Sequence, residues 1–136
     1  MCIYHDTKRV TLAVTLDASG SMLPHMLIFK GAPSGQIATK EFLTYPEGGH
    51  YLSQLKAWMD EQAMNKWIDY VLIPWKYMKA CGVVPLLIFD AYHVRMMGNI
   101  MNCIQSLGIE VIHIHAGCTY LCQPMDMGIK RQSRLR

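Results

Sequence analysis

The sequence predicts an α/β fold in which a mixed β-sheet is flanked by helices. Two observations indicate the sheet: a β-branched run at residues 10–17 precedes a second apolar run at 26–29, and residues 83–89 are almost entirely apolar. A third observation indicates a helix, because apolar side chains between residues 52 and 72 recur at three- and four-residue spacing. The order β-β-α-β-α-β, with helices between the later strands, implies layers joined by crossover connections.

The first two strands are expected to form a hairpin. The run Val10–Asp17 carries β-branched and apolar residues, and Ala18-Ser19-Gly20-Ser21 then supplies turn-forming side chains. The second strand, Met26–Phe29, ends at Lys30 and Gly31. Residues 33–49 are rich in Gly, Pro, Ser and Thr, which predicts a long irregular connection.

The remaining elements are predicted from the periodicity of apolar residues and the length of each apolar segment. Residues 52–72 predict a helix with one broad buried face, for which Ser53 is a reasonable N-cap. The run Val83–Phe89 predicts a central strand covered on both faces, since an edge strand would alternate. The last elements are a helix over Met96–Leu107, ended by Gly108, and a short strand over Ile109–Ile114.

Composition restricts the classes of protein. The chain has 136 residues, 51% of them hydrophobic, which fits a single domain over residues 1–136 with one core. No stretch approaches about 18 consecutive apolar residues, and no secretory signal pattern begins the chain, so we expect a soluble, intracellular protein without a membrane partner. Five cysteines without a framework spacing fit a reducing compartment. The net charge of +3 is mildly basic.

Two aspartates lie where a surface charge would not be expected. Asp90 closes the apolar run of residues 83–89, and Asp126 lies in the segment Cys122-Gln123-Pro124-Met125-Asp126-Met127-Gly128. A carboxylate at the end of a buried strand is costly unless it is paired or binds a metal. With one helix and one strand between them, both could reach the same sheet edge and hold Mg²⁺ or Mn²⁺. Alternatively, each aspartate caps a helix.

Several segments together resemble a known family. They are Val10–Gly20, Leu23–Gly31, the segment around Trp58-Met59-Asp60-Glu61, Leu86–His93, and Gly117–Gly128 with its Thr-x-x-x-Gln-Pro-x-Asp-x-Gly pattern. Over about residues 8–130 the chain resembles the DDE superfamily endonuclease domain (DDE-1 type) of pogo- and Tigger-like transposases. The resemblance implies a ribonuclease-H-like fold, metal-dependent DNA cleavage and strand transfer, and a nuclear location if the source is eukaryotic. It also implies that Asp90 and Asp126 are the second and third members of a catalytic, metal-binding acidic triad.

The sequence departs from this family at its beginning. The family's first catalytic Asp lies on a strand that precedes the segment matching Val10–Asp17, but only nine residues stand there in this chain. Asp6 is the sole acid among them, and no apolar strand leads into it. We therefore expect a partial domain, truncated before Val10, that lacks the first strand and is inactive alone. Either Val10–Asp17 then pairs with Val83–Phe89, or an apolar sheet edge stays open, which favours self-association.

Two further readings compete with the nuclease reading. The first is a nucleic-acid-binding or self-associating remnant without catalysis. Its candidate phosphate ligands are Arg95, Lys130, Arg131 and Arg134. The second is a small zinc-binding domain, since four nitrogen or sulfur ligands can form a closed tetrahedral site. Its candidate ligands are His113, His115, Cys118 and Cys122. The tryptophans, including Trp58, are interpreted as core or flanking residues of the helix, not as a platform for base stacking.

Overall fold

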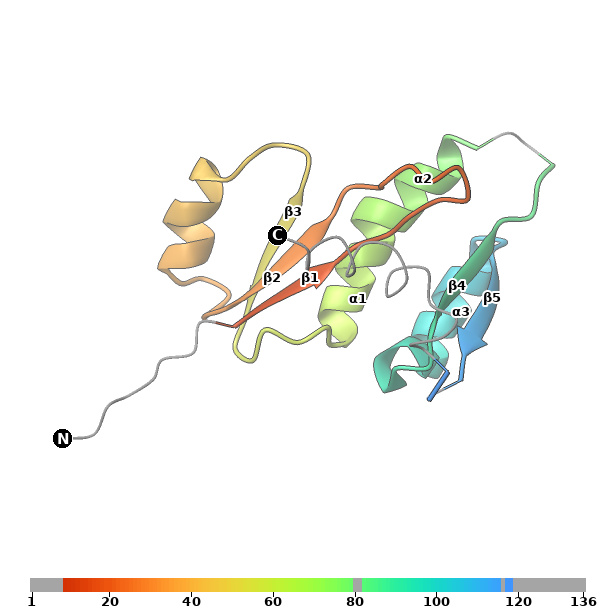
Figure 1. The fold of residues 1–136 in the computed structure, drawn as a ribbon. Helices are drawn as coiled ribbons and strands as arrows, with labels where there is room; N and C mark the ends of the chain where they lie inside the picture. Colours follow the sequence, from red (N-terminus) through yellow and green to blue (C-terminus); the bar gives the residue numbers. More distant parts are fainter. Residues whose placement is uncertain (1–8, 80–81, 116, 119–136) are drawn as a thin grey trace. The chain divides into compact units, whose positions relative to one another are not determined.

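The computed structural model describes residues 9–79, 82–115 and 117–118 of the chain (Figure 1). The chain divides into two compact units, residues 1–63 and residues 64–136. Within the described residues, no helix is both long and apolar enough to cross a membrane.

The first unit contains the predicted hairpin. Strand β1 (Val10–Ala13) pairs antiparallel with β2 (Met26–Lys30), with Val10 opposite Phe29 and Ala13 opposite Met26. In the connection, the Asp17 carboxylate accepts hydrogen bonds from the backbone N–H groups of Ser19 (2.9 Å) and Ser21 (3.1 Å). The hairpin prediction is confirmed, and Asp17 has a local role because it closes the turn.

A third strand in this unit was not predicted. Strand β3 (His50–Gln54) pairs parallel with β2, with Met26 opposite His50, so the sheet order is β1-β2-β3. The prediction that a helix covers residues 52–60 is therefore wrong, and Ser53 is a strand residue, not an N-cap. Pairing with β2 satisfies the backbone of this segment, and such a non-local partner cannot be recognised from helical spacing alone.

The connection between β2 and β3 is less irregular than predicted. Two short helical segments, Ile37–Glu41 and Phe42–Thr44, occupy its middle. Phe42 and Tyr45 lie against Phe29 of β2, with ring centroids 5.9 and 5.3 Å away. Tyr45 also meets Tyr51 of β3 at 5.0 Å. These aromatic contacts fix the connection to the sheet, where turn-forming composition alone would favour a loop.

The long helix begins nine residues later than predicted, at Glu61 instead of Leu52. Helix α1 (Glu61–Trp67) is preceded by Asp60, whose carboxylate accepts a hydrogen bond from the N–H of Ala63 (2.9 Å) and so acts as the cap. The helical backbone continues through a wider turn, Ile68–Leu72, into α2 (Ile73–Tyr77). The wider turn suits Pro74, which has no N–H to donate to an ordinary helical turn.

The second unit has a parallel strand pair with a crossover helix. Strand β4 (Leu86–Asp90) pairs with β5 (Glu110–Ile114), with Leu86 opposite Glu110 and Asp90 opposite Ile114. Between them, a single tight turn at His93–Met96 leads into α3 (Gly98–Ser106), which buries Ile100 and Ile104 completely. Gly108 has φ of +72°, the left-handed conformation of a helix-ending residue. The predicted helix and last strand are confirmed apart from their end residues.

The side chains of strand β4 are more exposed than predicted. Phe89 is buried, but Leu86 and Ile88 are 49% and 52% exposed, and Ile112 of β5 is exposed beside them. Alternation places these three side chains on one face of the pair. The expectation of a strand covered on both faces is therefore wrong. The buried residues of this unit are Met64, Trp67, Ile68, Val71, Leu72, Phe89, Val94, Ile100, Ile104 and Ile109.

The five strands of the described segments form two sheets, β1-β2-β3 and β4-β5. The mixed α/β class is confirmed at this level. Among the described residues, β1 pairs only with β2 and β4 pairs only with β5. The two outcomes expected for a chain without a first strand, pairing of Val10–Asp17 with Val83–Phe89 or an open apolar edge, stay predictions, because β1 and β4 belong to different units.

Candidate functional site

Asp90 lies at the C-terminal end of the parallel pair β4-β5. It is the last residue of β4, opposite Ile114, and the next N–H, that of Ala91, donates to the Ile114 carbonyl (3.0 Å). The Asp90 side chain is 32% exposed, so solvent reaches the carboxylate at the strand end. The sequence places Asp90 here because an apolar β-forming run ends in one charged residue, and the structure confirms that position.

The Asp90 carboxylate has a cationic partner. Nη1 of Arg95 donates to Oδ1 of Asp90 and forms an ion pair with it. The tight turn at His93–Met96 brings Arg95 back over the strand end, since its N–H donates to the carbonyl of Tyr92 (2.9 Å). The guanidinium also lies over the rings of Phe89 (5.6 Å) and Tyr92 (6.0 Å). Sequence reasoning missed this partnership, which depends on the turn and not on helical spacing.

Burial disfavours the charged form of Arg95. Desolvation lowers the pKa of its guanidinium below the ordinary value. Arginine nevertheless keeps its charge at neutral pH. The Arg95 guanidinium therefore balances the charge of the Asp90 carboxylate and occupies one of its oxygens. In this structure Arg95 binds a carboxylate of the protein itself and not a phosphate.

Of the two histidines proposed as zinc ligands, His113 lies in β5 and His115 directly follows this strand. His113 lies opposite Phe89, with its ring edge-on at 4.8 Å, and its Nε2 is 3.4 Å from the Arg95 carbonyl. Side chains alternate along a strand, so His113 and Asp90 lie on opposite faces of the pair. Within the described part of the chain, no three His, Cys, Asp or Glu side chains gather into a group that could hold a metal ion. Cys122 lies outside the described residues.

Other predicted residues also fall outside the described segments. They are Asp6, Asp126, Lys130, Arg131 and Arg134. Their predicted roles, including the convergence of Asp126 with Asp90, stay predictions. A single carboxylate paired with a guanidinium does not provide the oxygen ligands that Mg²⁺ or Mn²⁺ requires. Asp90 and Arg95 by themselves therefore do not make a metal site, and the predicted role of Asp90 as a metal ligand stays a prediction.

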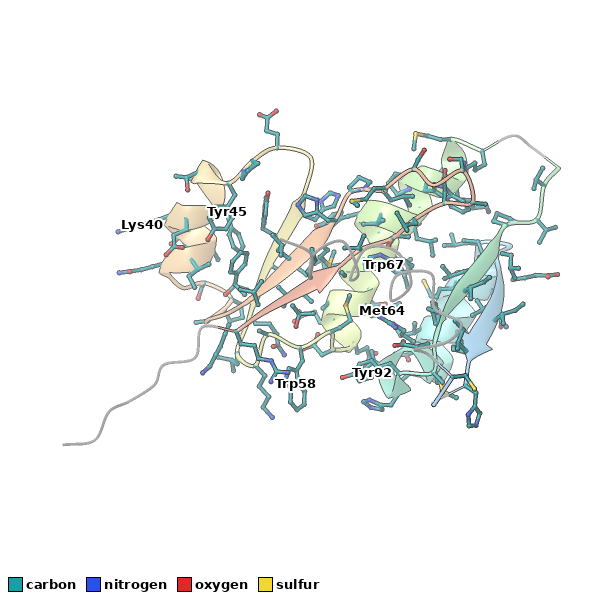
Figure 2. The ribbon with its side chains drawn as sticks, in the orientation of Figure 1. Lys40, Tyr45, Trp58, Met64, Trp67 and Tyr92 are labelled. Atoms are coloured by element: carbon teal, nitrogen blue, oxygen red, sulfur yellow. The ribbon has the colours of Figure 1, made fainter. Side chains whose placement is uncertain are left out.

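A second group of side chains gathers in the first unit. Arg9, Lys30, Leu55, Lys56 and Trp58 line an open pocket of about 250 Å³. Trp58 precedes α1 and is 45% exposed, so its interpretation as a helix residue is wrong. Figure 2 shows its side chain projecting from the loop that follows β3. The sequence contained one signal for this group: Arg9 directly precedes the first predicted strand, and Lys30 ends the second.

One comparison with known proteins found a match. A family model described as DDE superfamily endonuclease matches residues 7–135, nearly the whole chain. No curated protein and no solved structure matches the chain. The segment matched by the family model includes both compact units and the strand that ends in Asp90. The chain therefore belongs to the DDE superfamily endonuclease family.

Proposed function

We propose that this chain is a transposase-derived, nuclease-like domain of the pogo/Tigger type, in which Asp90 and Asp126 are carboxylate ligands of Mg²⁺ or Mn²⁺. The observation that carries the proposal is the partly exposed Asp90 carboxylate at the C-terminal end of a parallel strand pair. Carboxylates at such an edge can hold hard divalent ions beside a phosphodiester. Membership in a family of DDE endonucleases supports the assignment of DNA as the substrate class.

The first test measures metal binding by the purified chain. Mn²⁺ titrated into the wild type, followed by calorimetry, should bind more tightly than Mn²⁺ titrated into Asp90→Asn or Asp126→Asn. Asp69→Asn is the matched control, because Asp69 is an exposed aspartate on the helical segment Ile68–Leu72. Equal affinity in the wild type and in Asp90→Asn would remove Asp90 from the metal site.

The second test concerns activity. We propose that the 136-residue chain alone does not cut DNA, because two carboxylates cannot hold two ions in the octahedral geometry needed for in-line displacement. A supercoiled plasmid incubated with the chain in Mg²⁺ or Mn²⁺ should remain supercoiled. Nicking that disappears in Asp90→Ala/Asp126→Ala would contradict the proposal and indicate a third ligand such as Asp6.

The non-catalytic alternative is nucleic-acid binding by the same domain. The open pocket of Arg9, Lys30 and Lys56 favours it, because cations without acidic partners attract phosphate. Lys130, Arg131 and Arg134 stay candidate phosphate ligands at the end of the chain, whereas Arg95 is paired with Asp90. Binding and catalysis are separable in the tests above, since neither the plasmid assay nor the Mn²⁺ titration depends on this pocket.

A further inference from the structure

Three cations meet at one end of the β1-β2-β3 sheet. Arg9 directly precedes β1, and Lys30 is the last residue of β2; the Lys30 N–H donates to the Arg9 carbonyl (3.1 Å). Lys30 also lies opposite Gln54, the last residue of β3, and Lys56 follows two residues later. Sheet pairing therefore fixes the backbone positions of all three cations. Their side chains line the open pocket together with Leu55 and Trp58.

The charge of this pocket is not balanced by the described residues. None of the acidic side chains in the described segments forms an ion pair with Arg9, Lys30 or Lys56. Instead, the Arg9 guanidinium and the Lys56 ammonium lie over the Trp58 ring, 5.7 and 5.3 Å from its centroid. Like charges gathered without a counter-charge raise the local positive potential, which favours an anionic ligand. The exposed indole adds an aromatic surface beside them.

The loop that carries Lys56 and Trp58 is held in place by side-chain hydrogen bonds. Oε1 of Gln54 accepts from the N–H groups of Lys56 (2.8 Å) and Trp58 (3.1 Å), and Nε2 of Gln54 donates to Asp60 (2.6 Å). One amide side chain thus ties the end of β3 to the residue that caps α1. The loop is therefore ordered before any ligand arrives, which lowers the entropy cost of binding.

The loop also contains backbone strain. Ala57 has φ of +54°, is fully buried, and accepts a hydrogen bond from the Thr11 hydroxyl at its carbonyl (2.6 Å). A non-glycine residue in this conformation costs about 1–2 kcal/mol. Strain of this kind persists where the surroundings over-determine the backbone, and it clusters at functional sites. Here it turns Ala57 inward and leaves its neighbours Lys56 and Trp58 exposed.

We propose that this pocket binds single-stranded DNA, with Arg9, Lys30 and Lys56 contacting a phosphate and Trp58 contacting the adjacent base. The inference rests on the proposed function in that the same domain handles DNA. An open pocket suits a chain that passes across it, and cations interleaved with an aromatic side chain bind single strands with little sequence preference. On binding, the cations above the indole shift toward the phosphate and uncover the ring.

The main experiment measures binding of a fluorescently labelled oligo(dT) to the full 136-residue chain by anisotropy over a range of salt concentrations. Lys30→Gln/Lys56→Gln should weaken binding and flatten the slope of log affinity against log salt by about 1.4, the value for two lost phosphate contacts on a single strand. Lys40→Gln/Lys66→Gln removes the same charge elsewhere and should leave the slope close to that of the wild type. Figure 2 shows Lys40 on the helical segment away from Trp58. Equal slopes for the two double variants would contradict the proposal that this pocket binds the oligonucleotide.

A second readout tests the aromatic contact. Trp58→Ala should weaken oligo(dT) binding about tenfold, and Trp58→Phe should retain most of it, since loss of one stacked base costs about 1–3 kcal/mol. Quenching of tryptophan emission by oligo(dT) should fall sharply in Trp58→Phe, because of the other two tryptophans Trp67 is buried and Trp75 does not line the pocket. Unchanged affinity in Trp58→Ala would contradict the base contact.

Two control arms separate this inference from the proposed function. Inorganic phosphate at millimolar concentration should compete only weakly with oligo(dT). If phosphate competes at a concentration as low as that of the oligonucleotide, the pocket is a site for small anions and the proposal is overturned. If the wild type binds no oligo(dT), the pocket inference fails, while Mn²⁺ binding that depends on Asp90 would still support the nuclease-like assignment. If Asp90→Asn binds Mn²⁺ like the wild type but the lysine variants lose oligo(dT), only the metal proposal fails.

Discussion

Asp90 and Arg95 form an ion pair whose energy can be measured directly. Both side chains are partly exposed, so solvent screens the interaction and a contribution of about 1 kcal/mol is expected. Asp90→Asn and Arg95→Met should each lower the free energy of unfolding by about that amount, and the double variant should cost less than the sum. Urea unfolding of the four proteins measures the coupling. Strict additivity would show that the contact contributes nothing to stability.

The same pair predicts how the site responds to metal. The Arg95 guanidinium occupies an Asp90 oxygen that a divalent ion would need. Arg95→Gln should therefore raise Mn²⁺ affinity about two- to fivefold, the factor expected when a partly solvated ion pair no longer competes. Mn²⁺ titration of the variant measures this change. The double variant Arg95→Gln/Asp90→Asn should not show this increase in Mn²⁺ affinity. If the increase persists in the double variant, the metal binds elsewhere.

At the scale of elements, the loop after β3 is organised by Gln54. Gln54→Glu keeps an acceptor for the N–H groups of Lys56 and Trp58 but places a carboxylate against the Asp60 carboxylate. The repulsion raises the pKa of this carboxylate pair in the folded state, so the variant's stability should increase as pH falls through that raised pKa. At pH 7 we expect a loss of about 1–3 kcal/mol.

Thermal unfolding between pH 7 and pH 4 tests this prediction. The difference in unfolding temperature between Gln54→Glu and the wild type should decrease as the pH is lowered. Gln54→Leu provides the comparison, because it removes the hydrogen bond to Asp60, together with those to Lys56 and Trp58, without adding a charge. Its deficit in stability should persist across this pH range. A deficit of Gln54→Glu that does not change with pH would show that Asp60 and residue 54 are not in contact.

At the scale of the whole molecule, the exposed face of β4-β5 should govern solubility. Leu86, Ile88 and Ile112 present an apolar surface beside a strand edge that pairs with no other described strand. Surfaces of this kind promote association between copies. Leu86→Lys/Ile88→Lys should lower static light scattering at high protein concentration with little change in unfolding midpoint. Equal scattering by the wild type and the variant would show that this face is not the cause of any association.

The basic end of the chain gives a second whole-molecule prediction. Deleting residues 130–136 removes Lys130, Arg131, Arg134 and Arg136. If all four contact phosphates, the salt slope for duplex DNA should flatten by about 3–4 units. Duplex titrations of the full and shortened chains at several salt concentrations measure this difference. An unchanged slope would assign these four charges to solvent and leave the pocket in the first unit as the candidate phosphate surface.

What the sequence determined by itself depends on short-range patterns. Turn-forming residues between a β-branched run and an apolar run specified the β1-β2 hairpin, and apolar spacing ended by Gly108 specified α3. The apolar run that ends in one charged residue located Asp90 at the end of a strand. Each of these features is decided by residues within about one turn or one hairpin of each other, so local propensity and periodicity are sufficient.

Only the tertiary structure decided the features that depend on distant partners. Residues 50–54 carry a spacing that also fits a helix, and pairing with β2 makes them a strand. The exposed face of β4 follows from what packs against it, which no local pattern encodes. The pocket of Arg9, Lys30 and Lys56 forms because sheet pairing and the Ala57 turn bring three separate segments together. Hydrogen bonding between segments far apart in sequence supplies this information, because it fixes which local preference is realised.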